Sequence, residues 1–481
     1  MGNCLQAGVY RVDITPPIGI SMCGYFARAG VSNSLERQLT ATAAVLASGG
    51  NKIAILGCDL ISILNPVVDE IRADIAAALK TSVDSILINY SHTHCGPNTW
   101  DLSWESEDQK RLQRSYLDNL KRLLIGCAVA ADRQMRPARI GTGSGSSHIG
   151  INRRELDESG KIFLGENPDG PMDPTVGVIR IDEMNGKPMA VLFSYGCHTV
   201  TMGPKFLGLT PDFPGPARDL IENATGATSI YLQGAAGDIN PVTGIGPTED
   251  DTENMTRLGQ SLGAEVLKTF SEIRTNSVRG ERLIFASLTK NSLYPYVPVT
   301  DGPIHLEAIG EAALLPLLPF PLLDDARGIQ AQCAQRLEKA KRAGLPEHQL
   351  AFHYRFSDWA NLLLRNVESG ARQISVSVNL QAIRIGDMAL TSAAGETLSE
   401  LGLRVKAGSP FAETQFLGYS NGCLGYIPNA ECYPAEGWSP WETYLVPDML
   451  SQAYMLPMHF APEAGQQLVD RCIALLKGLT H

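Results

Sequence analysis

The stretch from Lys52 to Tyr90 reads KIAILGCDLISILNPVVDEIRADIAAALKTSVDSILINY, and it decides the fold. Two short apolar runs, 52–58 and 85–90, enclose a segment, 66–80, that has apolar residues at helical spacing and a proline at its start. The order strand, helix, strand predicts a parallel pair of strands joined by a right-handed crossover. We therefore predict an α/β fold with mixed β-sheets flanked by helices.

The same patterns continue on both sides of this unit. Alternating or continuous apolar runs predict strands at 8–15, 41–48, 175–182, 189–196, 229–234, 281–291, 373–386 and 387–394. Helical spacing predicts helices at 107–132, 216–223, 254–274, 326–343, 348–366, 397–405 and 464–478. The glycine-rich stretch 141–154 carries no phosphate-binding fingerprint and is interpreted as a loop. The segment 314–323 contains three prolines, which exclude a regular helix, and it is interpreted as buried packing, an oligomer contact or an apolar lid.

Composition narrows the classes of partner. The chain has 481 residues, 44% of them hydrophobic, and 40 Lys and Arg against 51 Asp and Glu give a net charge of −11. The sequence has no run of basic residues of the kind that binds phosphate groups. We therefore do not expect it to bind nucleic acid or anionic membranes, and we expect no stable membrane anchor. Ten cysteines without a Cys-x-x-Cys pair indicate reduced thiols and a cytoplasmic location. With no clear linker, we expect 1–481 to be a single domain, and homo-oligomerisation stays open.

Five apolar strands run out into polar residues. Ligands and catalytic groups of α/β folds gather beyond the carboxyl ends of strands, so these residues are candidates for one cleft. They are Asp59, His92 with His94, His198, Asp238 and Glu396. Alternation along a strand would place His92 and His94 on one face, where one imidazole can hold a metal while its neighbour moves protons.

Two histidines and one carboxylate are the usual protein ligands of a hydrolytic zinc ion. His92, His198 and Glu396 would supply them, and the remaining position would hold a water whose pKa falls to about 7. Cys95 and Cys197 are odd in register with their neighbouring histidines, so they are interpreted as packing residues.

An ordered set of motifs resembles the catalytic domain of the neutral/alkaline ceramidases. The set is His-Thr-His-x-Gly-Pro at 92–97, Asn152-Arg153, a strand ending in His198, Asp212 with Pro214-Gly215, Gln233 to Gly237-Asp238, Gly395-Glu396 and Gly425-Tyr426. The resemblance implies that Tyr426 joins His92, His198 and Glu396 as a zinc ligand. It also implies that His94 and Arg153 act on the scissile amide, with His94 passing a proton from water to the leaving amine and Arg153 stabilising the oxyanion.

Two departures limit what the resemblance implies. Asn240 stands where the family has a serine to which a catalytic role is given, and Asp238 and Asn240 are predicted to bind substrate. We also expect a catalytic domain alone, without the secretory start and the C-terminal immunoglobulin-like domain of the family. The predicted function is therefore a zinc-dependent hydrolase of a linear amide bond in an N-acyl compound. The alternatives are an esterase, lactonase or carbamate hydrolase with the same site, and a zinc-binding protein without catalysis.

Overall fold

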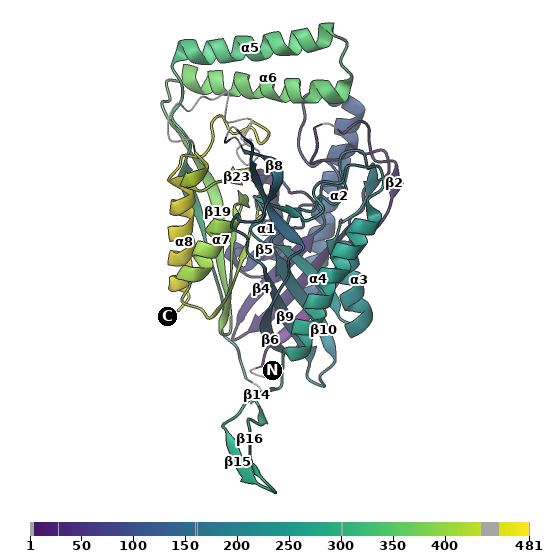
Figure 1. Cartoon of the computed structure of the whole chain (residues 1–481), viewed down its shortest axis with the longest axis vertical. Coiled ribbons are helices and arrows are strands. Elements are labelled where there is room, and N and C mark those ends of the chain that lie inside the picture. The colour runs from purple at the N-terminus through teal and green to yellow at the C-terminus, as the bar shows by residue number, and fades with distance from the viewer. Residues whose placement is uncertain are drawn as a thin grey trace.

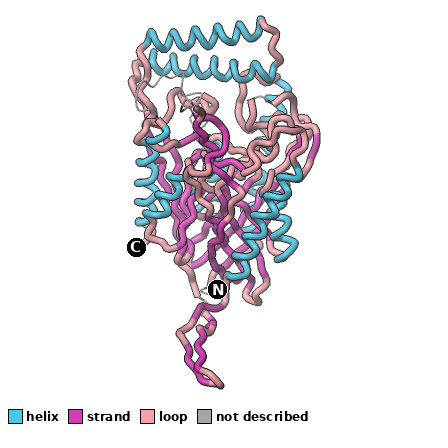
Figure 2. The backbone as a smooth tube through the Cα atoms, in the orientation of Figure 1, coloured by secondary structure: helices cyan, strands magenta, loops and turns pink. Residues whose placement is uncertain are grey.

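The computed structural model describes residues 4–26, 28–158, 160, 162–299, 302–433 and 452–480. Helices cover the outside and strands fill the interior (Figure 2). The α-helices of the described residues are α1 (Asn65–Leu79), α2 (Glu107–Arg133), α3 (Pro214–Thr225), α4 (Thr252–Glu272), α5 (Leu323–Arg342), α6 (Glu347–Glu368), α7 (Ser399–Gly408) and α8 (Ala464–Gly478). Each predicted helix is confirmed, because its apolar stripe spans enough turns to be read from the sequence alone.

The large sheet contains the unit that decides the fold. Its strands, in spatial order, are β12 (Thr228–Gln233), β10 (Pro188–Tyr195), β9 (Thr175–Glu183), β6 (Arg136–Ser146), β1 (Gln6–Asp13), β3 (Thr40–Ser48), β4 (Asn51–Cys58) and β5 (Ile86–Tyr90). β4 and β5 are parallel around α1, as predicted, whereas β9 and β10 form an antiparallel hairpin. The sheet is therefore mixed.

A second sheet packs on the first and creates four layers. It contains β18 (Leu306–Pro316), β19 (Ser375–Ile385), β20 (Met388–Ala393) and β22 (Glu413–Leu417). One apolar core joins the two sheets, with Ile55 and Leu192 from the first meeting Ile383 and Leu390 from the second. α1 to α4 cover the outer face of the large sheet, and α7 and α8 cover the outer face of the second (Figure 1). The α/β class with mixed sheets flanked by helices is confirmed.

Short strands connect the layers near one end of the molecule. They form the sheets β13 (Ile239–Pro241), β7 (Gly150–Leu156) and β8 (Ile162–Asn167); β21 (Glu396–Thr397) and β23 (Tyr426–Ile427); and β11 (Gly208–Leu209) and β2 (Ser34–Leu35). Two more ribbons, β14 (Ser277–Arg279) with β17 (Tyr296–Pro298) and β15 (Leu283–Ala286) with β16 (Lys290–Leu293), project from the opposite end (Figure 1).

The interpretation of 141–154 as a loop is wrong. Residues 141–146 belong to β6 and 150–154 to β7, so that only 147–149 lie outside a strand, and the glycines of β6 follow from packing rather than from turns. A Cβ at Gly141 would lie 2.7 Å from Ile273 Cγ2, and one at Gly143 would lie 3.0 Å from Ile273 Cγ1. These glycines share one face of the strand, and they let the chain that follows α4 approach the backbone closely.

Two other expectations are refined by the structure. The stretch 281–291 is not one strand but most of the β15–β16 hairpin, because a turn at 287–289 reverses the chain. The segment 314–323 begins as the end of β18 and then leads into α5; Leu315 and Leu317 are buried, whereas Leu322 is 78% exposed. The sequence from Pro428 to Tyr444 is rich in aromatic residues and predicts a loop, most of which lies outside the described residues. None of the described helices has the length and apolar character needed to cross a membrane.

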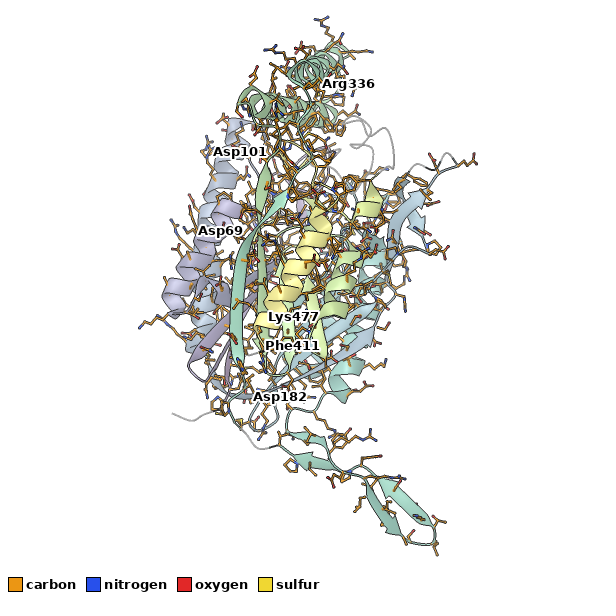
Figure 3. All side chains as sticks on the ribbon, turned by 90° about the vertical axis from the view of Figure 1, so that its left-hand side faces the viewer. Asp69, Asp101, Asp182, Arg336, Phe411 and Lys477 are labelled. Atoms are coloured by element: carbon orange, nitrogen blue, oxygen red, sulfur yellow. The ribbon has the colours of Figure 1, made fainter. Side chains whose placement is uncertain are left out.

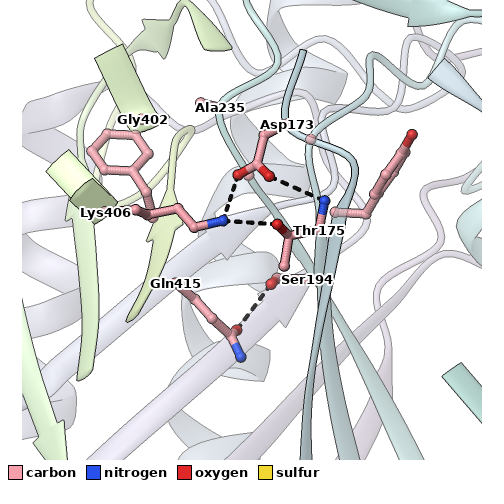
Figure 4. A pocket seen from close by; sticks show the side chains of 11 residues that line it. Asp173, Thr175, Ser194, Ala235, Gly402, Lys406 and Gln415 are labelled. Atoms are coloured by element: carbon pink, nitrogen blue, oxygen red, sulfur yellow. Dashed lines mark hydrogen bonds and ion pairs between the residues drawn. The ribbon is translucent and has the colours of Figure 1, made fainter. Parts of the chain in front are cut away.

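A partly buried polar cluster ties the two sheets together (Figure 4). Lys406 Nζ of α7 lies 2.7 Å from Asp173 Oδ2 and donates to Thr175 Oγ1 of β9. Ser194 of β10 donates to Gln415 Oε1 of β22 at 2.9 Å. Because β10 leads to His198 and α7 follows Glu396, these bonds fix the spacing between the two halves that carry the predicted site.

Candidate metal centre

His92 and His94 follow β5, but strand alternation does not bring them together. β5 ends at Tyr90, and His92 has a φ of 60°, a left-handed conformation that costs energy for a residue with a Cβ. This turn brings the Nε2 atoms of His92 and His94 to 3.3 Å from each other. The prediction that the two rings share one site therefore agrees with the geometry, although its physical reason was wrong.

Three predicted residues, His92, His198 and Tyr426, meet around the predicted Glu396 although all four are far apart in the sequence. Glu396 Oε2 lies 3.4 Å from His92 Nε2 and 3.2 Å from His198 Nε2. The Tyr426 hydroxyl lies 3.4 Å from the same nitrogen of His198. Because β21 pairs with β23 in parallel and Glu396 stands opposite Tyr426, a backbone ladder holds these two side chains in register.

The histidine tautomers make this cluster a site for a cation. Nδ1 of His92 faces the carbonyl oxygen of Ile61 at 2.9 Å, and Nδ1 of His198 faces that of Ala236 at 2.6 Å. Since a carbonyl only accepts, each Nδ1 carries the proton and each neutral ring turns a lone pair on Nε2 toward Glu396. Two nitrogen lone pairs and a carboxylate oxygen thus converge on one point. A proton on Glu396 could form a hydrogen bond to only one of the two nitrogens, whereas a cation could contact both.

The spacing of these atoms fits a zinc ion. Tetrahedral zinc with bonds of about 2.0–2.1 Å keeps its ligand atoms about 3.3 Å apart. The distances from Glu396 Oε2 to the two Nε2 atoms, 3.4 and 3.2 Å, match that separation. A carbonyl behind each ligating ring is also the outer-shell arrangement that metal-binding histidines have as a rule.

His94 is close enough to be a rival ligand but is held differently. The ligand atoms of His92, His94 and His198 lie within 4.8 Å of one another, so a three-histidine set is also compatible with a metal. Among the described residues, however, Nδ1 of His94 is buried without a hydrogen-bond partner, while the Tyr25 ring lies against the imidazole at 4.8 Å. A ring whose Nδ1 no carbonyl holds can take and release a proton at that nitrogen, which favours His94 as the proton carrier.

Burial keeps the histidines neutral and their nitrogens available. Desolvation lowers the pKa of His92 to about 4, against the opposing effect of Glu396, and it lowers the pKa of His94 well below its usual value. Burial also raises the pKa of Glu396, and the neighbouring His92 and Arg153 oppose this rise. The two imidazoles in contact with this buried carboxylate are neutral, and a divalent cation bound between them would place a compensating charge directly against it.

Arg153 stands on β7 with its guanidinium beside Tyr426. Its Nη2 donates to the Tyr426 hydroxyl at 3.0 Å and to the Gly237 carbonyl at 2.5 Å, while Nη1 donates to Asn240 Oδ1 at 3.3 Å. A fixed arginine and a phenol therefore point to the same side of the histidine cluster. That is the arrangement needed to stabilise negative charge on an oxygen.

The two residues predicted to bind substrate differ in their surroundings. Both oxygens of Asp238 accept hydrogen bonds within the protein, from Ser399 N at 2.7 Å and from Asn152 Nδ2 at 3.1 Å, so this carboxylate holds β7 and α7 in place. Asn240 is buried and orients Arg153. Asp59 lies away from the cluster and binds Arg218 at 2.7 Å.

A cavity of about 410 Å³ opens beside His94 and Tyr426. Aromatic side chains dominate its walls, and Glu347, His348 and Ala351 of α6 line one side of it. The aromatic lining residues are Tyr25, Phe26, Trp100, Trp104, Tyr426 and Tyr454. This volume and lining are typical of a site for an organic molecule of drug-like size.

Two tyrosines of the site were not anticipated from the sequence. The Tyr419 hydroxyl donates to Glu396 Oε2 at 3.3 Å, and that of Tyr454 donates to Glu396 Oε1. Tyr419 has a φ of 49° and follows Gly418, so a tight turn could have been suspected there. Tyr454 has no periodicity or motif that would single it out. Both keep the carboxylate oriented toward the histidines.

Comparisons with known proteins give the site its context. No family model matches the chain. Neutral ceramidases A and B of Dictyostelium discoideum are each 26% identical to it over 265 residues, covering 50% and 51% of this chain. The match spans 36% of the length of each of these relatives, roughly a third.

The fold extends the similarity to almost the whole chain. The crystal structure of neutral ceramidase from Pseudomonas aeruginosa superposes with a TM-score of 0.63 at 16% identity, covering 99% of this chain and 75% of that one. A structure described as ceramidase complexed with C2 gives 0.64, with 99% and 76% covered. These similarities confirm the resemblance that the motifs predicted: part of the chain is similar in sequence, and nearly all of it in fold, to neutral ceramidases.

Proposed function

We propose that this chain is a zinc-dependent hydrolase that cleaves a linear amide bond in an N-acyl compound. The single observation that carries the proposal is the convergence of the His92 and His198 Nε2 atoms on one oxygen of a fully buried Glu396. Tyr426 completes the proposed ligand set. The proposal treats 1–481 as one catalytic domain, because the core between the two sheets is continuous.

The chain's own side chains fit amide hydrolysis. A bound zinc ion would supply Lewis acidity and a water acidic enough to attack at neutral pH. His94, whose Nδ1 no carbonyl holds, accepts the proton of the attacking water and delivers it to the leaving amine. Arg153 and Tyr426 donate to the carbonyl oxygen as negative charge develops on it, and Asn240 keeps the guanidinium aimed.

We expect the substrate to be smaller and more water-soluble than ceramide. The relatives are ceramidases by name, but the match spans about a third of their length. Ceramide must be drawn from a bilayer, and a net charge of −11 gives this chain no attraction to anionic lipid. A cavity of about 410 Å³ suits a short-chain N-acyl amine.

A metal analysis followed by a hydrolysis screen tests the proposal. Purified protein should hold about one zinc per chain and should hydrolyse members of a panel of N-acyl amines, and a chelator should abolish the activity. Faster cleavage of matched esters, lactones or carbamates would favour the alternative acyl bonds, since the same oxyanion donors serve any acyl carbon. If the protein binds zinc but hydrolyses no substrate of the panel, the result would support the alternative of a zinc-binding protein without catalysis.

A further inference from the structure

An exposed ribbon projects from the body at the end opposite the short strands (Figures 1 and 2). It runs from Ser277 to Pro298 and consists of the β14–β17 and β15–β16 pairs; we call it the arm. Each pair forms a separate two-stranded sheet, so within the described part of the chain no third strand pairs with either edge of the arm. Two-stranded ribbons are at best marginally stable in water unless another surface covers them.

The arm carries apolar side chains on one face. Leu283 stands opposite Leu293, and Phe285 lies two residues beyond Leu283, so the three share a face of the ribbon. They are 52%, 42% and 43% exposed respectively, and Leu288 at the turn is fully exposed. Apolar residues gathered on an exposed strand pair are typical of an interaction surface.

The charge of the arm is opposite to that of the rest of the chain. Arg279, Arg282 and Lys290 outnumber its one carboxylate, Glu281, in a protein of net charge −11. The arm is thus a basic and apolar element on an acidic molecule. It is therefore suited to bind an acidic surface that also has apolar residues.

The β7–β8 hairpin of the same chain is such a surface. Leu156, Phe163 and Leu164 are 62%, 42% and 45% exposed there, and β8 is the edge strand of its sheet. The sequence 154–166 contains four carboxylates, Glu155, Asp157, Glu158 and Glu166, against Arg154 and Lys161. The two hairpins are complementary in charge and alike in apolar character.

Their placement allows two copies to bind each other reciprocally. In Figure 3 the β7–β8 hairpin and the arm both extend from the same side of the body, one toward each end of the long axis. The arm therefore cannot reach the hairpin of its own chain. A twofold axis perpendicular to the long axis would place each arm on the β7–β8 hairpin of the other copy, which gives two identical contacts in a closed dimer.

A lipid surface fits the arm less well. The cavity beside His94 is lined by α6, and α6 lies at the end of the molecule opposite the arm (Figure 1). An arm inserted in a membrane would hold the cavity away from that membrane. The acidic partner surface is, by contrast, present on the chain itself.

We propose that the arm is a dimerisation element that binds the β7–β8 hairpin of a second copy of this chain. The contact pairs the basic residues of the arm with the carboxylates of the hairpin and covers Leu283, Phe285 and Leu293. It stands independently of the proposed enzymatic activity, because none of the residues substituted in its test belongs to the proposed zinc ligands or to the residues proposed to act on the amide.

Charge exchange between the two surfaces tests the proposal. One variant reverses the arm (Arg279→Glu, Arg282→Glu, Lys290→Glu), and the other reverses the hairpin (Asp157→Lys, Glu158→Lys, Glu166→Lys). Sedimentation velocity and light scattering should find the wild-type chain dimeric and each variant alone monomeric, with a dissociation constant raised at least about tenfold. An equimolar mixture of the two should dimerise again, because both contacts are then between opposite charges.

Further measurements make a negative result informative. Leu283→Ser with Phe285→Ser should also give a monomer, and circular dichroism should confirm that every variant is folded, since all the substituted side chains are exposed. A monomeric wild-type chain would overturn the proposal, and so would variants that stay dimeric. Binding of a monomeric chain to phosphatidylcholine/phosphatidylserine vesicles, lost in the Leu283/Phe285 variant, would assign the arm to lipid instead.

Discussion

Replacing His92 and His94 one at a time should separate the metal ligand from the proton carrier. His92 contacts Glu396 and is held from behind by the Ile61 carbonyl, whereas Nδ1 of His94 has no such partner among the described residues. His94→Ala leaves the contacts among His92, His198 and Glu396 intact. We therefore expect His94→Ala to retain zinc and His92→Ala to lose it.

The magnitudes follow from the roles. Loss of even an outer-shell partner of a metal site costs about 10- to 100-fold in affinity, so losing the His92 ligand should cost more than about 100-fold, or about 2.7 kcal/mol. General acid–base catalysis contributes about 10²- to 10⁴-fold, so His94→Ala should lower kcat by that factor, or by about 2.7–5.5 kcal/mol. Substrate binding should change much less, because His94 forms only one part of the cavity wall.

Zinc content after dialysis and kcat on an N-acyl amine measure the two effects separately. His305→Ala is a matched control, because the His305 side chain is 42% exposed and pairs only with the nearby Glu307 among described residues. It should retain both zinc and activity. If His94→Ala loses zinc and His92→Ala keeps it, a ligand set that includes His94 is the better assignment. The reasoning from the Nδ1 partners is then refuted.

Three further predictions concern the ligands, the substrate and the pH dependence of stability. His198→Ala and Glu396→Ala should each lose zinc; full occupancy in both, measured by elemental analysis, would contradict the ligand assignment. A short-chain N-acyl amine should be cleaved with higher kcat/KM than long-chain ceramide in mixed micelles; a tenfold advantage for ceramide, about 1.4 kcal/mol, would refute the expectation of a soluble substrate. Burial lowers the pKa of His459 to about 3, so the folded state binds fewer protons than the unfolded state between about pH 6.5 and 3 and loses stability as the pH falls through that window. Between pH 7 and pH 5 the free energy of unfolding should therefore fall by about 2 kcal/mol less in His459→Gln than in the wild-type chain, as measured by denaturant titration. An unchanged pH dependence would show that His459 does not cause the loss.

The sequence by itself determined the elements whose signal is local. The apolar spacing of 66–80 and the runs on either side of it predicted α1 between parallel β4 and β5, and the pattern at 464–478 predicted α8 within its observed bounds. Such periodicities arise from neighbours three or four residues apart in a helix and two apart in a strand, so they need no knowledge of distant contacts. The order of the motifs along the chain predicted the resemblance to the neutral ceramidases.

Only the tertiary structure decided what depends on distant backbone. The glycine-rich stretch 141–154 resembles a loop in sequence, yet Gly141 and Gly143 lie in β6, where Ile273 after α4 packs too closely to leave room for a Cβ. The stretch 281–291 alternates as a single strand would, yet a turn at 287–289 reverses the chain and pairs β15 with β16.

The candidate metal centre combines both kinds of information. The sequence named His92, His198, Glu396 and Tyr426, but their convergence follows from a left-handed turn at His92 and from pairing of β21 with β23 across 30 residues. Tyr419 and Tyr454 were missed because a hydrogen bond to a buried carboxylate leaves no trace in composition or spacing. Sequence periodicity thus fixes which face a residue takes locally, whereas long-range pairing and close packing determine which of those faces meet.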